Sequence, residues 1–432
     1  MQTSLWERCA LEVRLGVKGG VGAVPVPLRR NRDFLLLWSG MAVSVLGSRI
    51  STVAYPLLVL ALTGSPGLAG LVGFLATLPY LVLQLPAGAL VDRWDRKRLM
   101  IVCDVVRAAA LGSLAAALSA DAVWIGHVLV VAFVEGACYV FYNLAQSAAV
   151  RHVVHSTQLA SALGRNEARE RGASMLGTPL GGILFGVGRA VPFLVDAVTY
   201  LASIVTLLLI QKDFQAETRP KPTTRMLAEV KEGVVWLWNQ PFLRAASFLV
   251  AASNLLFAAL VLVLIVVARD GGASPAMIGV MLSGAGVGGV AGSLLAPRLE
   301  RRLSMKRIVI GANWVWALLL PLVLVAPGAL SLGAVFAAMA FVGPVWNVDI
   351  GAYQLTITPD RLLGRVTSAE TLLAYGALPL GSLAAGILLE TVGTQGATLA
   401  LAAGMVAVAL TATASGAIRA APSLAEARVA AD

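Results

Sequence analysis

Long apolar runs alternate with short polar segments along almost the whole chain. Most runs approach the ~20 apolar residues that cross a hydrocarbon core about 30 Å thick. Many contain glycine or proline, which membrane helices tolerate where neighbouring helices satisfy the freed backbone groups. The pattern predicts an all-α membrane protein with twelve transmembrane helices, over residues 34–62, 67–90, 99–119, 122–146, 164–187, 190–210, 241–268, 274–296, 307–326, 329–350, 366–390 and 395–418.

Composition excludes the water-soluble fold classes. Charged residues make up 13% of the 432 positions, against about 25% in soluble proteins. The three cysteines, Cys9, Cys103 and Cys138, show no metal-site or disulfide spacing. His152 and His155 have no third ligand in view, so we expect no metal. The first residues lack the apolar core and cleavage site of a signal peptide.

Lysine and arginine are distributed unevenly between the two sides of the predicted helices. With the N-terminus in the cytosol, 29 of the 33 basic residues fall in cytosolic segments, whereas Arg189 and Arg269 fall in outer loops. Basic residues concentrate on the cytosolic side of membrane proteins. We therefore expect a multi-pass protein of the plasma membrane with both termini in the cytosol. The same distribution explains the net charge of +10 without nucleic acid as a partner.

A long polar segment divides the chain into two six-helix halves. Gly88 and Gly292 end the second and eighth helices at a separation of 204 residues, and Gly182-Ile-Leu recurs as Gly386-Ile-Leu at the same separation. An even number of helices per copy gives a parallel repeat, the architecture of transporters with a central site between halves. The expected parts are a basic tail over 1–33, bundles over 34–210 and 241–418, a linker over 211–240 with an amphipathic helix near 225–239, and a tail over 419–432.

The turn after the second predicted helix is unusually rich in charge. It holds Gly88, Asp92, Arg93, Arg96, Lys97 and Arg98. This spacing resembles the signature loop of the major facilitator superfamily, except that Asp95 stands where many members carry glycine. The resemblance implies that the glycine lets helices two and eleven approach, that the acid lies near the start of helix eleven, and that the bases bridge the halves on the cytosolic side. In the second copy Ala296 replaces the acid.

Other segments resemble one branch of that superfamily. The enterobactin-exporter-like and macrolide-efflux-like members resemble this chain over Arg30 to Trp38, Asp196 to Tyr200 and Glu232 to Arg244. Helix five loosely resembles the glycine- and proline-rich motif of drug–proton antiporters, although a plain packing helix explains it equally well. Its relevant residues are Gly177, Pro179, Gly181 and Gly182.

Ionisable residues inside the spans are candidate functional sites, because charge in hydrocarbon is costly. Arg49 and Glu135 lie near mid-depth of helices one and four, which line the central cavity in this superfamily. We hypothesise that they form a cavity pair in which Glu135 responds to protons. A purely structural ion pair is the alternative.

The remaining intramembrane charges have more local expected roles. Asp104 and Arg107 share a helical face near the charged turn, and we expect them to be structural, with a proton relay as the alternative. Asp196 is also expected to be structural. Arg365 and Glu370 are expected latch partners, with Glu370 meeting Arg93 or Arg96.

These observations favour a secondary transporter, not an enzyme. No lysine follows a glycine, so a Walker A loop is absent and ATP is not the expected energy source. We expect a monomer in the bilayer, without a cofactor, that exports an amphipathic or hydrophobic small molecule by proton antiport. A siderophore or metabolite exporter, an importer, and a non-transporting receptor or scaffold are the alternatives.

Overall fold

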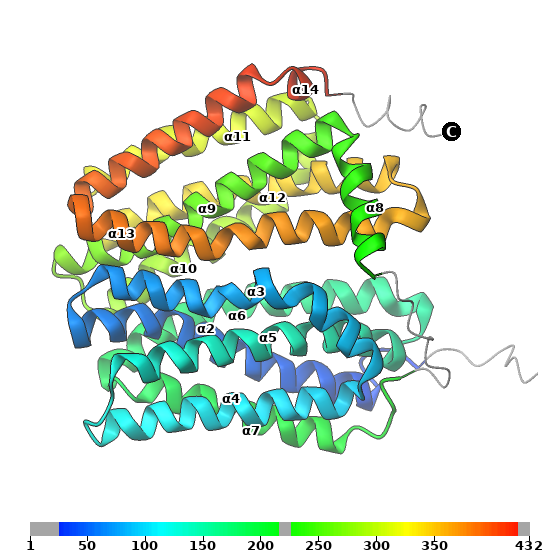
Figure 1. Ribbon diagram of the computed structural model, residues 1–432, viewed down its shortest axis with the longest axis vertical. Helices are drawn as coiled ribbons and strands as arrows, with labels where there is room; N and C mark the ends of the chain where they lie inside the picture. Colours follow the sequence, from blue (N-terminus) through cyan, green and yellow to red (C-terminus); the bar gives the residue numbers. More distant parts are fainter. Residues whose placement is uncertain (1–25, 216–225, 422–432) are drawn as a thin grey trace, which may run out of the picture.

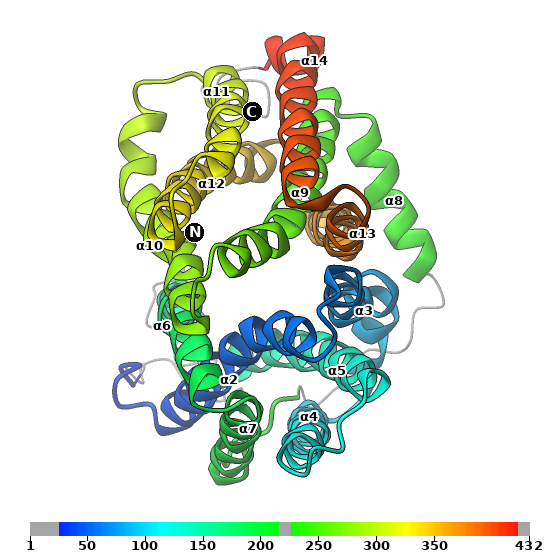
Figure 2. The same ribbon diagram turned by 90° about the vertical axis from the view of Figure 1, so that its left-hand side faces the viewer.

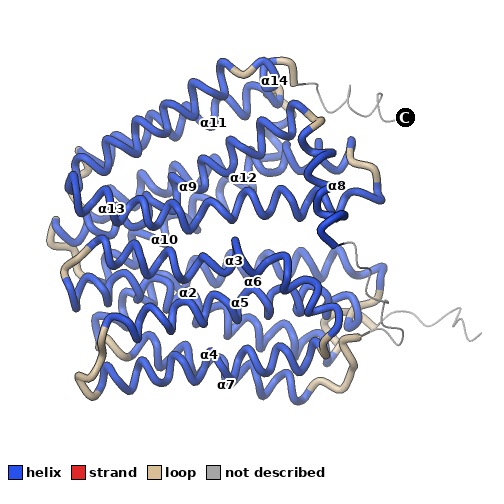
Figure 3. Tube along the Cα trace, in the orientation of Figure 1, coloured by secondary structure: helices blue, strands red, loops and turns tan. Residues whose placement is uncertain are grey.

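The chain folds almost entirely into helices. The computed structural model describes residues 26–215 and 226–421, and within these ranges there is no β-strand (Figure 3). The first half contains α2 (Arg32–Thr63), α3 (Pro66–Arg93), α4 (Arg96–Ser119), α5 (Ile125–Val153), η1 (Ser156–Gln158), α6 (Leu159–Val187) and α7 (Val191–Leu209). The second half contains α8 (Met226–Trp238), α9 (Pro241–Asp270), α10 (Pro275–Glu300), α11 (Met305–Leu319), η2 (Leu320–Leu324), α12 (Ala329–Ile357), α13 (Asp360–Ala414) and α14 (Gly416–Arg419).

Ten helices of the described chain are long and apolar enough to cross a membrane. Helix α13 contains two spans, because its backbone breaks at Gly393 with φ +69°. Helix α6 is not among the ten, since its first half is charged and its second half is rich in glycine. With α6 included and α13 counted as two, the described residues contain the twelve expected segments.

The helices form two bundles that face each other across the middle of the molecule. Figures 1 and 2 show α2–α7 in one bundle and α9–α13 in the other, with α3 beside α13 and α6 beside α10. Helix α8 packs on α13 at one end of the molecule, which we call the α8 end; the other is the opposite end. The predicted amphipathic helix is present as α8, whereas residues 216–225 of the predicted linker lie outside the described residues.

Helices α3 and α10 begin in the same way at the opposite end. Each has a serine before its first residue, Ser65 or Ser274, followed by proline. The serine hydroxyl accepts a backbone N–H three residues later, and proline suits the first helical position because it has no N–H to satisfy. The two copies therefore share a local helix start as well as a helix order.

The two bundles approach each other most closely through glycine at the opposite end. A Cβ on Gly182 of α6 would lie 2.2 Å from the Pro275 carbonyl oxygen and 3.0 Å from Cα of Gly279 in α10. A Cβ on Gly386 of α13 would lie 3.0 Å from Cα of Gly70 in α3. We call these contacts the two glycine crossings. They confirm that Gly182 and Gly386 are equivalent positions of a repeat.

One of the two crossings carries an additional polar contact. The Glu390 carboxylate on α13 accepts hydrogen bonds from the Ser65 hydroxyl at 2.9 Å and the Gly67 backbone N–H at 2.7 Å. An acid at a helix N-terminus is stabilised by the unpaired N–H groups and the helix dipole. The position 204 residues earlier is Gly186, so the second crossing has no such acid.

Gly88 does not have the environment that the family resemblance implies. A Cβ on Gly88 would meet no atom within 4 Å, so α3 does not pack closely on another helix there. Its expected counterpart Gly292 packs against α12, where a Cβ would lie 2.0 Å from the Phe341 carbonyl oxygen. The expectation that Gly88 brings helices two and eleven together is therefore wrong for this structure.

Candidate functional site

The charged turn joins α3 to α4 and is tied to its own bundle. Asp95 is the N-cap of α4, and its Oδ1 accepts the backbone N–H of Arg98 at 2.9 Å. This explains why aspartate can replace the usual glycine. Arg96 donates to the Phe214 carbonyl at 3.0 Å, and Lys97 donates to the Ile210 carbonyl at 2.7 Å. These hydrogen bonds join the turn to the segment that follows α7.

The other charged residues of the turn lie at the end of α3 and the start of α4. Arg93 is exposed at the last residue of α3, and Arg98 is exposed beside Asp95. The backbone of Asp92 belongs to the last turn of α3. Ala296, which stands in its place in the second copy, is fully buried with Ile308 and Val345 and could hold a charge only at high cost.

The expected latch residues Arg365 and Glu370 have different surroundings in the structure. Arg365 forms an ion pair with Glu232 of α8. The Glu370 carboxylate makes no ion pair or hydrogen bond within the described ranges, and its Oε1 is buried. Contact between Glu370 and Arg93 or Arg96 is therefore not formed here.

The N-terminal bundle buries a cluster of charges around Arg107. The Glu135 carboxylate accepts hydrogen bonds from the hydroxyls of Tyr55 at 2.8 Å and Tyr200 at 3.0 Å, and it lies 3.5 Å from the Arg107 guanidinium. The same guanidinium donates to the Ser48 hydroxyl at 3.1 Å and lies over the Tyr200 ring, 4.0 Å from its centroid. Glu135 is thus held by three donors from three other helices.

Two further carboxyl groups share this environment. Asp104 and Asp196 are both fully buried, and both interact electrostatically with Arg107. Neither oxygen of Asp104 has a hydrogen-bond partner among the described residues. We call Asp104, Arg107, Glu135 and Asp196 the Arg107 cluster. It contains three carboxyl groups and one permanent cation.

The expected pairing of Arg49 with Glu135 is wrong. Arg49 pairs with Glu170 of α6 at 3.5 Å, and Glu170 also pairs with Arg169 at 3.1 Å. Arg49 faces α6 because the two helices cross at Gly177, where a Cβ would lie 2.5 Å from that of Arg49. Arg107, expected to be structural beside the charged turn, takes the place beside Glu135.

Sequence reasoning missed Arg169 and Glu170, although both lie within the predicted helix over 164–187. Helix α6 begins at Leu159, well before the apolar run. The Glu167 and Arg171 pair, bonded at 2.8 Å with helical spacing, was the available signal that the helix extends further.

The glycines of helix five serve two different contacts. Gly177 and Gly181 face α2 within the bundle, where a Cβ on Gly181 would lie 2.6 Å from the Ile50 carbonyl. Gly182 faces α10 across the interface, and Pro179 lies between Gly177 and Gly181 within α6. Close packing therefore accounts for this segment.

Three tyrosines connect the Arg107 cluster to the bundle interface. The Arg107 guanidinium lies 5.8 Å from the Tyr139 ring centroid. Tyr139 lies 5.5 Å from Tyr80 of α3, which stacks on Tyr375 of α13 at 6.2 Å between centroids. The contacts run from a buried cation in one bundle to an aromatic ring of the other.

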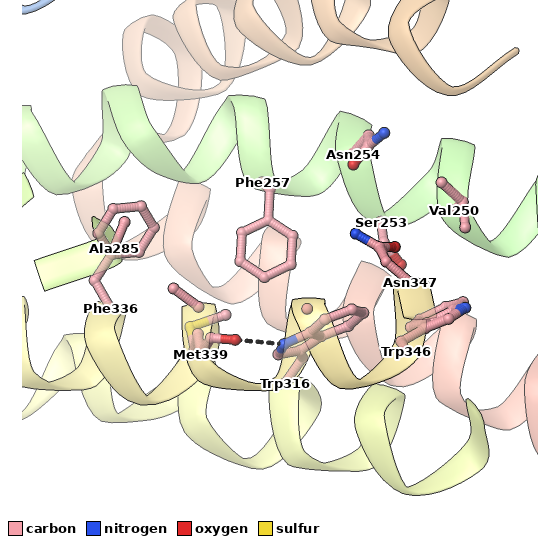
Figure 4. A pocket seen from close by; sticks show the side chains of 12 residues that line it. Val250, Ser253, Asn254, Phe257, Ala285, Trp316, Phe336, Met339, Trp346 and Asn347 are labelled. Atoms are coloured by element: carbon pink, nitrogen blue, oxygen red, sulfur yellow. Dashed lines mark hydrogen bonds between the residues drawn. The ribbon is translucent and has the colours of Figure 1, made fainter. Parts of the chain in front are cut away.

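The C-terminal bundle contains a cavity of about 240 Å³ with a different lining. Figure 4 shows aromatic rings of Phe257, Trp316 and Phe336 with Ser253 and Asn347 nearby. Phe257 and Trp316 meet edge to face at 5.1 Å, and Trp316 stacks on Trp346 at 5.2 Å. The lining residues that the structure describes are Val250, Ser253, Asn254, Phe257, Ala285, Trp316, Phe336, Met339, Ala340, Gly343, Trp346 and Asn347, and none of these side chains is ionisable.

Comparison with known proteins agrees with this architecture. The family model described as transmembrane secretion effector matches residues 24–428. Multidrug efflux pump Tap of Mycobacterium tuberculosis is 29% identical over 402 residues, covering 89% of this chain and 93% of that protein. Macrolide efflux protein A of Streptococcus pyogenes is 24% identical over 205 residues, covering 47% of this chain and 51% of that protein.

Solved structures show the same fold. A variant of the nucleoside transporter NupG superposes with a TM-score of 0.74 at 13% identity, covering 90% of this chain and all of that one. A bacterial homologue of the lysosomal transporter Spinster superposes with a TM-score of 0.63 at 14% identity, covering 92% and 97% of the two chains. The chain is a multi-pass membrane protein that belongs to the transmembrane secretion effector family of the major facilitator superfamily.

Proposed function

We propose that this protein is a proton-driven exporter of amphipathic, drug-like molecules that works by alternating access in the plasma membrane. The observation that carries the proposal is the Arg107 cluster. Its carboxyl groups outnumber its cation by three to one inside a transmembrane bundle. Removing carboxylates from water costs several kcal/mol each, and one cation cannot compensate three of them, so the cluster as a whole takes up a proton.

Glu135 is the carboxyl group through which proton uptake acts on structure. As an anion it is held by Tyr55, Tyr200 and Arg107. A proton on Glu135 removes the charge that attracts Arg107, whose guanidinium then pairs better with Asp104 or Asp196. The cluster thus has two arrangements of one cation among three acids, which is the kind of two-state element that a gradient can bias.

The tyrosine contacts give this switch a route to the interface. Arg107 lies near the Tyr139 ring, and Tyr139, Tyr80 and Tyr375 are in series across the two bundles. A shift of the guanidinium changes the packing of Tyr139, and through it the contact between α3 and α13. Proton binding in one bundle is thereby coupled to the relative position of the other.

The arrangement of the bundles supports alternating access with the α8 end in the cytosol. The glycine crossings hold the opposite end together, whereas Gly88 near the α8 end has open space around its Cα. This fits a state that is closed outward and open inward. The basic residues near the α8 end agree with a cytosolic location.

The names of the relatives support export of drug-like compounds. One is a multidrug efflux pump and another a macrolide efflux protein. Together with the absence of a Walker A sequence, they favour a monomer energised by the proton gradient without ATP or another cofactor.

The test is drug efflux in inverted membrane vesicles that carry the full chain. We expect a respiratory substrate to drive accumulation of a macrolide or a lipophilic dye, and a proton uncoupler to abolish it. Glu135→Gln should bind the drug but lose gradient-driven accumulation. The matched control is Glu167→Gln, since Glu167 is exposed on α6 and pairs only with Arg171 at the surface. Uncoupler-insensitive accumulation, or full activity of Glu135→Gln, would contradict the proposal.

A further inference from the structure

The cavity of the C-terminal bundle contains buried polar groups that have no protein partner. Ser253 and Trp346 line it and are 3% and 1% exposed, yet the Ser253 hydroxyl and the Trp346 indole N–H have no hydrogen-bond partner within the described ranges. Buried polar atoms in native proteins are nearly always bonded. Two unsatisfied groups in one cavity point to an absent partner.

Some of the other polar side chains of the lining donate hydrogen bonds to backbone carbonyls, and one does not. Asn254 donates to the Ala374 carbonyl at 3.0 Å, and Trp316 donates to the Met339 carbonyl at 2.8 Å. Asn347 is exposed and makes no side-chain hydrogen bond within the described ranges. Figure 4 shows Ser253, Trp346 and Asn347 toward the same end of the cavity, with Phe336 at the other. The polar groups without a hydrogen-bond partner among the described residues thus lie together at one end of the cavity.

We propose that this cavity binds a neutral aromatic group that carries a hydrogen-bond acceptor, such as a ring ketone or an aryl amide. Rings of Phe257, Trp316 and Phe336 provide the apolar contact, and the Ser253 and Trp346 donors meet the acceptor. The proposal rests on the export function, because it names the part of the exported molecule that the C-terminal bundle recognises.

Charge selects between the possible ligands. Aromatic rings also attract cations. A cation, however, leaves both donors unsatisfied, and the lining residues that the structure describes include no carboxylate to compensate for its desolvation. A neutral acceptor can accept a hydrogen bond from either donor, so the lining favours it.

Size limits how much of the ligand enters. Pockets that enclose a drug-sized molecule measure about 300–1,000 Å³, and this cavity measures about 240 Å³. It therefore holds one ring system of a larger molecule, and the rest of that molecule lies outside the cavity.

The test uses Prodan, a neutral naphthalene ketone, with the purified full-length protein in detergent. Binding is measured by energy transfer from tryptophan. We expect Trp346→Phe and Ser253→Ala each to weaken binding about fivefold, the loss of one hydrogen bond. Gly343→Leu should abolish binding, because a Cβ on Gly343 meets open space and a larger side chain fills the cavity without a clash.

Two controls keep the hydrogen-bond argument separate from general damage. Trp314→Phe alters a tryptophan that is bonded to Thr413 at 2.9 Å, and Ser247→Ala alters a serine of α9 bonded to the Leu243 carbonyl at 2.8 Å. Neither lines the cavity, so both should bind Prodan as the parent does. Ethylnaphthalene, which lacks the ketone, should compete equally in parent and Ser253→Ala.

Several outcomes would overturn the inference. They are unchanged Prodan binding in Trp346→Phe and Ser253→Ala, unchanged binding in Gly343→Leu, or stronger competition by the cation tetraphenylphosphonium than by neutral aromatic ketones. Unchanged binding in the first two variants would mean that water alone occupies the polar end. Binding needs no gradient, so a protein that binds Prodan as expected but fails to pump would retain this site and lose the proposed function.

Discussion

The two bundles share a backbone plan but bury opposite chemistry. The N-terminal bundle encloses Arg107 with three carboxyl groups, and the C-terminal bundle encloses Trp316, Trp346 and Phe257 around a cavity without ionisable side chains. Their helix starts at Ser65 and Ser274 and the two glycine crossings remain equivalent. The repeat therefore preserves the contacts between the bundles, while their interiors have become specialised, in our proposal one for protons and one for the exported molecule.

Replacing Arg107 should have the largest effect on the contrast between the two bundle interiors. Arg107→Leu leaves the buried acids without a cation, so we expect a loss of about 3–5 kcal/mol in the free energy of unfolding. Denaturant unfolding of the detergent-purified protein measures this loss. Adding Glu135→Gln should restore part of it. The control Arg171→Leu removes a surface pair and should cost less than about 1 kcal/mol. Equal losses in the two single variants would show that the cluster is not desolvated.

The glycine crossings should respond equally in the two halves. Gly182→Val and Gly386→Val each place a side chain against backbone of the other bundle, and we expect each to cost about 1–3 kcal/mol. Thermal unfolding of both proteins provides the comparison. Gly186→Val, one turn further along α6 with no atom within 4 Å of its added Cβ, is the control. A large cost at one crossing and none at the other would argue against equivalence of the two contacts.

Asp92 tests the asymmetry of the charged turn. The second copy carries the buried Ala296 at this position, so only the first turn has an acid there. We expect Asp92→Asn to reduce transport about tenfold, a barrier change of about 1.4 kcal/mol, while the protein still folds and inserts. Asp95→Asn, which preserves an N-cap acceptor, is the control. Vesicle efflux and membrane content should be measured together, and full activity would reduce the turn to a topology signal.

Substitution of Glu390 should have the smallest effect on the contact between the bundles. Glu390→Gln retains an acceptor oxygen for Ser65 and Gly67 but loses the charge, which is worth about 0.3–1 kcal/mol at an exposed helix N-terminus. Pulsed electron resonance between spin labels on Val187→Cys and Val392→Cys, with the native cysteines replaced, should show a modest shift toward longer distances. A shift larger than that produced by Gly386→Val would reverse the expected ranking.

Sequence patterns predicted the helices and the repeat well, and the interior poorly. Hydropathy located the spans because burial in lipid requires long apolar runs, and it correctly marked Arg107, Glu135 and Asp196 as unusual. It could not determine their partners, because helix rotation and depth depend on packing between helices. The crossing at Gly177 turns Arg49 toward Glu170, and only the assembled bundle reveals that contact.

The aromatic cavity was harder to foresee. Trp316 and Trp346 are 30 residues apart on different helices, and nothing in their local sequence distinguishes them from ordinary packing residues. Their stacking arises from the fold of α11 against α12. The unbonded Ser253 hydroxyl is likewise a property of the assembled cavity.

The break at Gly393 has a consequence for biogenesis. Helix α13 reverses direction at one residue in the left-handed region, with no intervening loop and no lysine or arginine between Arg365 and Ala414. The turn therefore offers no positive charge to fix its side of the membrane, and neither arm can be placed without the other. We expect the two arms to leave the insertion machinery as a single hairpin. Truncation before Gly393 should therefore prevent insertion of the first arm as well as removing the second.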